Sequence, residues 1–293
     1  MLNKVLVFGE MLWDCLPEGD VPGGASMNVA LHLHIMGFES QLISAVGQDV
    51  LGEKLLEHFR SFGASDELIQ INQHETSRVL VDNRDKENVK YTIISPVAWD
   101  FIENTNKLTE AAKSCDALVF GTLGVRNHQS LQTLLELLHH TELRVFDANL
   151  RPPYYDFEVI ETLLGYTEIL KINEDELIAF GDYFNVDPTA EALCEFLDKH
   201  FPVETICITL GSKGALIYQE GQFISHPGYS VKVADTIGAG DAFLSGFVKS
   251  YLENHPISET LDFACKVGAY VASQQGGSPQ YQLSDLDLLK KKK

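Results

Sequence analysis

Short runs of β-branched and aromatic residues alternate with longer segments of helical periodicity along most of the chain. Alternation of this kind predicts a doubly wound α/β fold, in which a mostly parallel sheet carries helices on both faces. Segments such as 28–37, 127–140, 189–200 and 257–274 repeat apolar residues every three or four positions, as an amphipathic helix does. The expected strands are 4–9, 41–47, 117–121, 144–149, 168–173, 205–211 and 215–219.

Two segments interrupt this alternation. Residues 10–25 are rich in proline and glycine, and the strand-like runs 77–83 and 90–95 flank a charged turn, NRDKEN, as in a hairpin. We therefore expect a small β-sheet, built from about 10–25 and 74–100, that projects from the main sheet. It could form a lid over a site, or it could be an extension of the scaffold.

Charge and cysteine content restrict the class of partner. The chain has 22 Lys+Arg and 42 Asp+Glu, a formal net charge of −20, which argues against nucleic acid or an anionic membrane as the main partner. Its five cysteines are scattered and never spaced as CxxC, which favours a reduced compartment. No apolar run reaches the ~18 residues of a membrane span. We expect a soluble, cytoplasmic protein.

Polar residues follow several of the expected strands. In an open parallel sheet, ligands bind beyond the carboxyl ends of the strands, so these residues should meet at one rim. The alternative is that loops are polar in any case. The residues concerned are Glu10 and Asp14, 121–126, 149–151, 173–176 and 211–214.

The strongest local motif is a glycine-rich turn that leads into a helix near the C-terminal end. Gly238, Ala239 and Gly240 precede a helical apolar face, and Asp241 falls in its first turn. Free N–H groups and the helix dipole make such a terminus an anion site, and a carboxylate beside it can accept a proton. Alternatively, Asp241 only stabilises the dipole. A dinucleotide fingerprint is excluded because Phe243 replaces its last glycine, and no Walker loop occurs.

Two long segments resemble the signatures of the ribokinase-like, or pfkB-type, sugar kinases. DTIGAGDAF (235–243) resembles the C-terminal signature, and GGASMNVALHLHIMG (23–37) followed by VGQD (46–49) resembles the N-terminal one. The resemblance implies one kinase domain over 1–293 that transfers the γ-phosphoryl group of ATP to a sugar hydroxyl. It implies that Asp241 is the catalytic base, and that the anion hole is formed by Gly238, Ala239, Gly240 and the Asp241 amide.

The same resemblance suggests residues for the sugar. Asp14 matches the acid that binds sugar hydroxyls, and Gly24 and Asn28 match a sugar-contacting glycine and asparagine. Asn28 could instead cap the following helix. Arg126 and Arg151 could bind a sugar, neutralise phosphate or form ion pairs.

For the nucleotide and metals, Asn173 and Glu176 resemble an N-x-x-E motif that organises hydrated Mg²⁺ and phosphate, although they also form a capping box. Thr209, Gly211 and Gly214 resemble residues of the family's nucleotide-binding loop. Alternatively, the segment 209–214 is a plain turn between two strands. Cys265 stands where the family often has an adenine-contacting Asn. The backbone of Asp235 and Ile237, with the turn 275–277, resembles a site for K⁺.

Among these kinases, several segments look most like bacterial fructokinases: GEMLWD (9–14), FGTLGVR (120–126), DANLRPP (147–153) and LKINEDE (170–176). Fructose, converted to fructose 6-phosphate, is thus the expected acceptor. Alternatives are 2-keto-3-deoxygluconate, whose carboxylate suits a bidentate arginine, and ribose. A non-catalytic sugar or nucleotide sensor is an alternative of another class. The resemblance also suggests a homodimer formed through the lids.

Overall fold

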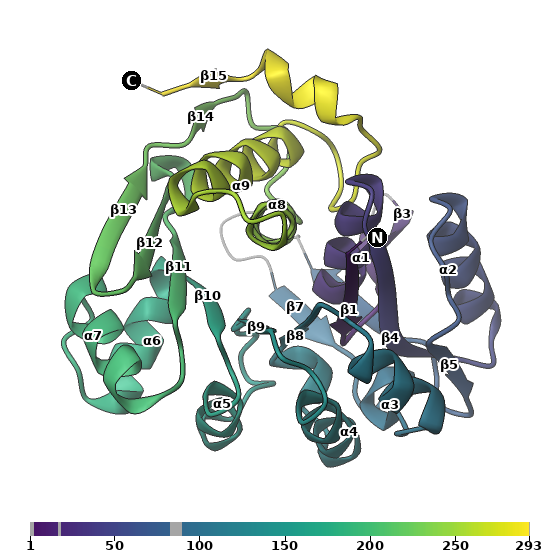
Figure 1. Cartoon of the computed structure of the whole chain (residues 1–293). Coiled ribbons are helices and arrows are strands. Elements are labelled where there is room, and N and C mark those ends of the chain that lie inside the picture. Colours follow the sequence, from purple (N-terminus) through teal and green to yellow (C-terminus); the bar gives the residue numbers. More distant parts are fainter. Residues whose placement is uncertain (1–2, 17–18, 83–89, 293) are drawn as a thin grey trace.

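The main sheet runs through the middle of the protein (Figure 1). The computed structural model describes residues 3–16, 19–82 and 90–292. Nine strands of this part pair in the order β13-β12-β11-β10-β9-β8-β1-β4-β5; β12 is antiparallel to both of its neighbours, and all other neighbouring strands are parallel. Their bounds are Lys4–Phe8 (β1), Glu39–Gly47 (β4), Ile69–Asn72 (β5), Ala117–Gly121 (β8), Arg144–Asp147 (β9), Ile169–Asn173 (β10), Thr205–Thr209 (β11), Ala215–Gln219 (β12) and Gln222–His226 (β13).

Helices cover both faces of this sheet, which confirms the predicted doubly wound fold (Figure 1). One face carries α1 (Ala25–Ile35), α2 (Val50–Ser61), α8 (Ala239–Leu252) and α9 (Ile257–Ala272). The other carries α3 (Asn106–Lys113), α4 (His128–Leu138), α5 (Phe157–Leu164), α6 (Glu174–Phe184) and α7 (Ala190–His200). Seven strands and four helices were expected from the sequence, and all eleven are present at or near the expected bounds.

The core has two layers because successive strand residues point to opposite faces. In β1, Val5 and Val7 pack beneath α1 and α8, whereas Leu6 and Phe8 pack on the side of α3 and α4. All four side chains are buried. Strands covered on both faces read as continuous apolar runs, which is why the sequence revealed them.

A second sheet is made from the two segments that interrupt the alternation. Its order is β3-β2-β6-β7, with β2 at Leu12–Leu16, β3 at Gly19–Gly23, β6 at Arg78–Asp82 and β7 at Lys90–Ile93. The expected hairpin between β6 and β7 is confirmed, and its turn lies outside the described residues. β3 leads directly into α1 through Gly24. The division into one domain with a closing lid stays a prediction.

The remaining elements are short. Strands β14 (Tyr229–Ser230) and β15 (Lys290–Lys291) pair near the C-terminal end. Four 3-10 helices are η1 (Ala98–Phe101), η2 (Leu123–Val125), η3 (Gly211–Lys213) and η4 (Leu283–Leu288). No helix within the described residues combines the length and apolar character needed to cross a bilayer.

We predict that Gly214→Ala destabilises the fold far more than Gly221→Ala. Both glycines have positive φ, at 96° and 72°, so alanine costs each about 1–2 kcal/mol. A Cβ on Gly214 would also overlap the carbonyl oxygen of His226, whereas a Cβ on Gly221 meets no atom within 4 Å. Denaturant unfolding should show the larger loss for Gly214→Ala, by about 1–3 kcal/mol, the range typical of overpacking. Equal losses would contradict the close packing of this loop.

Candidate active site

The carboxylate of Asp241 lies at the start of α8, where it meets α1. Asn28 of α1 donates a hydrogen bond from Nδ2 to Oδ2 of Asp241 at 2.8 Å. Asn28 does not cap α1, because the helix begins at Ala25 after Gly24, so that alternative is wrong. Burial raises the pKa of Asp241 to about 6, and the nearby Asp147 adds to the rise. Asp241 is therefore a fixed carboxylate that accepts a proton more readily than an exposed aspartate.

The turn before α8 presents several free backbone donors. Gly238 is the N-cap, in the left-handed region at φ 73°, and no side chain caps the helix. Among the described residues, no group accepts from the N–H of Gly238, Gly240 or Asp241. Ala239 differs from the predicted set, because its N–H donates to the carbonyl of Thr236 at 3.3 Å. Three of the four amides are thus available to an anion.

A glycine turn from the C-terminal region supports this anion site. A Cβ on Gly238 would overlap the carbonyl of Gly277. That carbonyl accepts from Nε2 of His32 at 2.9 Å, and Nδ1 of His32 faces the hydroxyl of Tyr281 at 3.3 Å. Burial lowers the pKa of His32 to about 4, so the ring is neutral and can donate to one group while accepting from the other. Asn28 and His32, one helical turn apart on α1, therefore hold the two sides of the α8 terminus.

A buried lysine that the sequence analysis missed lies beside these amides. Lys171 on β10 is in register with Asp147 on β9, and its Nζ lies 2.8 and 3.0 Å from the two Asp147 oxygens. A Cβ on Gly240 would come within 3.2 Å of the same Nζ. Burial acts to lower the pKa of Lys171, but the charges of Asp147 and Glu176 outweigh it and the pKa is raised. The site therefore holds a permanent cation.

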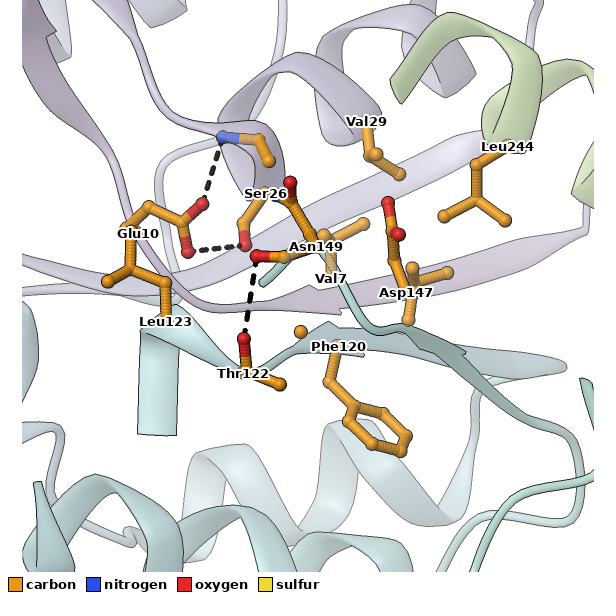
Figure 2. A pocket seen from close by; sticks show the side chains of 13 residues that line it. Val7, Glu10, Ser26, Val29, Phe120, Thr122, Leu123, Asp147, Asn149 and Leu244 are labelled. Carbon is orange, nitrogen blue, oxygen red and sulfur yellow. Dashed lines mark hydrogen bonds between the residues drawn. The ribbon is translucent and has the colours of Figure 1, made fainter. Parts of the chain in front are cut away.

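The carboxylate of Glu10 fixes the start of α1 through two hydrogen bonds. Its Oε1 accepts from the N–H of Ala25 at 2.9 Å, and its Oε2 accepts from Ser26 Oγ at 3.2 Å. Burial raises the pKa of Glu10, and the charge of Asp241 adds to the rise. A cavity of about 20 Å³ lies next to it, large enough for about one water, and Asp147 and Thr122 also line it (Figure 2).

Asp14 and Arg151 face the same region from the small sheet and from the loop after β9. Burial raises the pKa of Asp14 to about 6, and the charge of Arg151 acts against the rise. Arg151 also acts on Asp241 in the same sense. Gly24 is tightly placed, since a Cβ there would lie 2.7 Å from the Glu10 carbonyl. Arg151 thus lies near enough to both Asp14 and Asp241 to act on their carboxyl groups.

Arg126 is held in an ion pair. Its Nε and Nη2 each donate to Asp100 at 2.8 Å, and Nη2 also donates to the Ile94 carbonyl at 2.7 Å. Of the three roles left open by the sequence, the structure shows the ion pair. A sugar-binding role for Arg126 stays a prediction.

The predicted nucleotide residues lie along β10 and β11. Asn173 and Thr209 end these strands side by side and in register, and Gly211 and Gly214 follow in and after η3. Asn173 and Glu176 form the capping box, since each side chain accepts from the other's backbone N–H. Cys265 is only 6% exposed, on the buried face of α9, and burial raises its pKa to about 12. Its contact with adenine stays a prediction.

Two groups of residues could hold metal ions. Glu176 is buried and accepts from the N–H of Leu150 and Asn173, so it could bind Mg²⁺ through the waters that this ion retains. Within the described part of the chain, no three His, Cys, Asp or Glu side chains form a direct metal site. The loop of Asp235 adjoins the turn 275–277, because Asp235 Oδ2 accepts from the Gly276 N–H at 3.3 Å. In the described residues, the carbonyls of Asp235 and Ile237 accept no hydrogen bond, so they are free to meet water or a cation, and a K⁺ site here stays a prediction.

The fold and this site together define a small-molecule phosphotransferase: a doubly wound sheet whose rim holds a buried carboxylate, free helix amides and a lysine. Residues 18–282 match the pfkB family of carbohydrate kinases. The chain belongs to this family, whose members transfer a phosphoryl group to a sugar hydroxyl. The family resemblance seen in the sequence is thereby confirmed.

Individual relatives agree with this assignment. The fructokinase of Escherichia coli is 27% identical over 94% of this chain and 95% of its own. An ATP-dependent 6-phosphofructokinase of Thermoanaerobacterium thermosaccharolyticum is also 27% identical, over 98% and 92%. The structure of a Xylella fastidiosa fructokinase with bound ATP superposes with a TM-score of 0.86 at 21% identity, over 98% and 97%. The relatives share the kinase class and differ in the sugar.

We predict that Asp241→Asn stabilises the fold at neutral pH. Folding raises the pKa of this carboxyl from its usual 3.8 to about 6, so the folded state binds the proton more tightly, and stability falls as pH rises from about 4 to 6. An amide removes that penalty, worth up to about 3 kcal/mol at pH 7 and almost nothing below pH 4. Unfolding curves at both pH values measure the effect, and the exposed Asp182→Asn is the control. A loss of stability at pH 7 would contradict the buried state of Asp241.

Proposed function

We propose that the protein is an ATP-dependent fructokinase that forms fructose 6-phosphate and ADP. The observation that carries the proposal is the buried Asp241 carboxylate, held by Asn28 beside three free amides. In this reaction the sugar hydroxyl oxygen attacks the γ-phosphorus of ATP. A new O–P bond forms, the bond from the γ-phosphorus to the β,γ-bridging oxygen breaks, and the hydroxyl proton passes to Asp241.

The acceptor would bind between the small sheet and the α1 terminus. The carboxylate of Asp14 can accept hydrogen bonds from two hydroxyl groups, and the free Oδ1 of Asn28 can accept another. Gly24 lets the chain turn into α1 close to the backbone of Glu10 and Met11, where a Cβ would not fit, and its own backbone would border the sugar. Closure of the small sheet over this space would exclude water from the transferring group.

Arg151 keeps a second acceptor open. It is exposed at the rim and acts electrostatically on both Asp14 and Asp241. A guanidinium in this position can bind a sugar carboxylate or a second phosphate as a bidentate partner. Fructose is favoured by the fructokinase relatives, while 2-keto-3-deoxygluconate is the alternative that this arginine supports.

The phosphate groups of ATP would lie against α8 and Lys171. The amides of Gly238, Gly240 and Asp241 would donate to the transferred group, and the Lys171 ammonium would balance its charge from the side of the sheet. Thr209, Gly211, Gly214 and Asn173 would border the nucleotide. Glu176 would hold Mg²⁺ through water, and the ion would supply further positive charge to the phosphates. Carbonyl groups of Asp235 and Ile237 would bind K⁺ and stiffen the turn that precedes α8.

The proposal also covers assembly. Two copies would associate through their small sheets, where Val21 and Leu80 are 38% and 44% exposed.

A sensor without catalysis is the competing function. A sensor needs no proton acceptor at the anion site, so the position of Asp241 favours the kinase.

We expect Asp241→Asn to lower turnover by about 10²–10⁴-fold while sugar binding persists, because it removes the base and keeps the shape.

ADP release measured over fructose, 2-keto-3-deoxygluconate, ribose, tagatose phosphate and adenosine identifies the acceptor. For the wild type, kcat/KM should fall about tenfold per pH unit below pH 6, because the protonated carboxyl cannot accept a proton. Near-normal turnover of the variant would refute the base, and binding of a sugar without ADP release would favour the sensor.

We expect Lys171→Met to destabilise the protein by about 3–5 kcal/mol, because Asp147 is left buried without its partner. The double variant Lys171→Met/Asp147→Asn removes both charges and should recover most of that stability. If Lys171 balances phosphate charge, the double variant stays slow and its KM for ATP rises. Full recovery of activity in the double variant would show that Lys171 only stabilises the fold.

A further inference from the structure

The backbone of Gly277 is wedged between the two helices that form the candidate active site. On one side, a Cβ on Gly238, the N-cap of α8, would overlap the Gly277 backbone. On the other side, a Cβ on Gly277 itself would lie 2.7 Å from Nδ2 of Asn28, the atom that donates to Asp241. Carbon atoms pack at ~3.5–4.0 Å, so neither glycine can carry a side chain unless the helices move apart. Gly277 therefore sets the spacing between α1 and the start of α8.

The carbonyl oxygen of Gly277 is held by the ring of His32. Nε2 of His32, one helical turn after Asn28 on α1, lies 2.9 Å from this oxygen. Among the described residues, no second group donates to it. Both residues are buried, so water does not compete for the contact. The place of the wedge thus depends on one side chain of α1.

The two contacts of His32 fix where the proton of its ring lies. A carbonyl oxygen only accepts, so Nε2 carries the hydrogen and donates it to Gly277. In a neutral ring Nδ1 is then an acceptor, and the hydroxyl of Tyr281 lies 3.3 Å away to donate to it. Burial raises the pKa of Tyr281 and lowers that of His32 to about 4, so the hydroxyl keeps its proton and the ring stays neutral. Donation therefore runs in one direction, from Tyr281 through His32 to Gly277.

Both partners of this ring belong to one short segment, 277–281, which follows α9 and passes beside α1 (Figure 1). Tyr281 is buried, and its ring centre lies 5.2 Å from that of Tyr270 on α9 and 5.8 Å from that of His32. The segment is thus attached to a single imidazole at its first and last residues. Its two ends cannot move independently of α1 while both bonds are present.

The same turn also contacts the loop that precedes α8. The N–H of Gly276 donates to Oδ2 of Asp235 at 3.3 Å, and Oδ1 of Asp235 accepts from the N–H of Ile237 at 3.0 Å. Gly238 follows directly and meets Gly277 on its other side. A shift of the turn would therefore reach the free N–H of Gly238 through both contacts.

From these contacts we infer that His32 is a positioning residue for phosphoryl transfer, which acts through Gly277 on the amide of Gly238. The role rests on the proposed function, which supplies the anion at this amide. N–H groups stabilise a developing charge only when they point at it, and a misplacement of ~1 Å can cost ~10²-fold in rate. His32 itself touches neither the sugar nor the phosphate. Loss of its bond to Gly277 frees the turn and misdirects the amide.

Two substitutions separate this hydrogen bond from the packing of the ring. His32→Leu fills a similar volume and cannot donate, whereas His32→Gln offers an amide nitrogen at the same reach from the backbone as Nε2. With fructose and ATP, we expect His32→Leu to lower kcat by about 10–100-fold and to leave the KM for fructose within about threefold, because Asp14 is untouched. His32→Gln should recover kcat to within about threefold of wild type.

Calorimetric titration with ADP and with the non-hydrolysable analogue AMP-PCP gives a second readout that needs no sugar. AMP-PCP adds the third phosphoryl group, which is the group that the amide of Gly238 would meet. His32→Leu should weaken AMP-PCP by about tenfold and ADP by less than about threefold, and His32→Gln should restore AMP-PCP binding. A purely structural role would weaken both nucleotides to the same extent.

Leu33→Ala is the control for lost stability. Leu33 neighbours His32 on α1 and is fully buried, so its truncation leaves a cavity and lowers the Tm. It should change neither kcat nor the ratio of the two nucleotide affinities when measured below its Tm. If His32→Leu does not fold, Tyr281→Phe replaces it, because it keeps the ring and removes the donor to Nδ1; kcat should then fall by about 3–10-fold with the same nucleotide selectivity.

Three results would overturn the positioning role: wild-type kcat in His32→Leu, no recovery in His32→Gln, or an equal loss of kcat in Leu33→Ala. Wild-type kcat in His32→Leu leaves the kinase proposal intact. Selective loss of AMP-PCP binding in His32→Leu, in a protein that phosphorylates no fructose, supports the positioning role and overturns the proposed acceptor.

Discussion

The rest of the site depends on the ammonium of Lys171, buried among carboxylates at the ends of β9 and β10. It touches Asp147, acts on Glu176 and Asp241, and lies against Gly240. Three buried acids could not share this volume without it, because each would be driven to take up a proton. Lys171 thus lets Asp241 stay ionised near neutral pH, although burial still raises its pKa to about 6.

The same arrangement places positive groups at the rim of an otherwise acidic protein. The net charge of −20 repels phosphate at long range, and Asp147, Glu176 and Asp241 do so locally. The helix amides, Lys171 and the exposed Arg151 oppose this repulsion, and all of them lie at the carboxyl end of the sheet. For the proposed substrate ATP, this balance would favour the magnesium complex over the free nucleotide, because the complex carries less negative charge.

The sequence predicted the fold and part of the site. Buried strands and the glycine turn before Asp241 are local patterns, so they could be recognised without partners. The pair of Lys171 and Asp147 could not be recognised in this way. The two residues are 24 positions apart and meet only because β9 and β10 pair in a particular register. Lys171 is the one charged residue of β10, so it was an available signal, whereas Asp147 ends a strand that also begins with a charge, Arg144. From the sequence, Asn28 could be a helix cap or a ligand-binding residue, and only the observed start of α1 excludes the cap. Three roles were open for Arg126, and the structure shows its ion pair with Asp100, 26 residues away.

The bond between Asn28 and Asp241 joins positions 213 residues apart. During synthesis the N-terminal half, which contains Asn28, emerges well before Asp241, the free amides at the start of α8 and the Gly277 turn. No fragment that ends before α8 therefore contains Asp241 or the free amides beside it, so the site cannot be complete in such a fragment. The site is complete only when α8 and the turn at Gly277 are packed against α1.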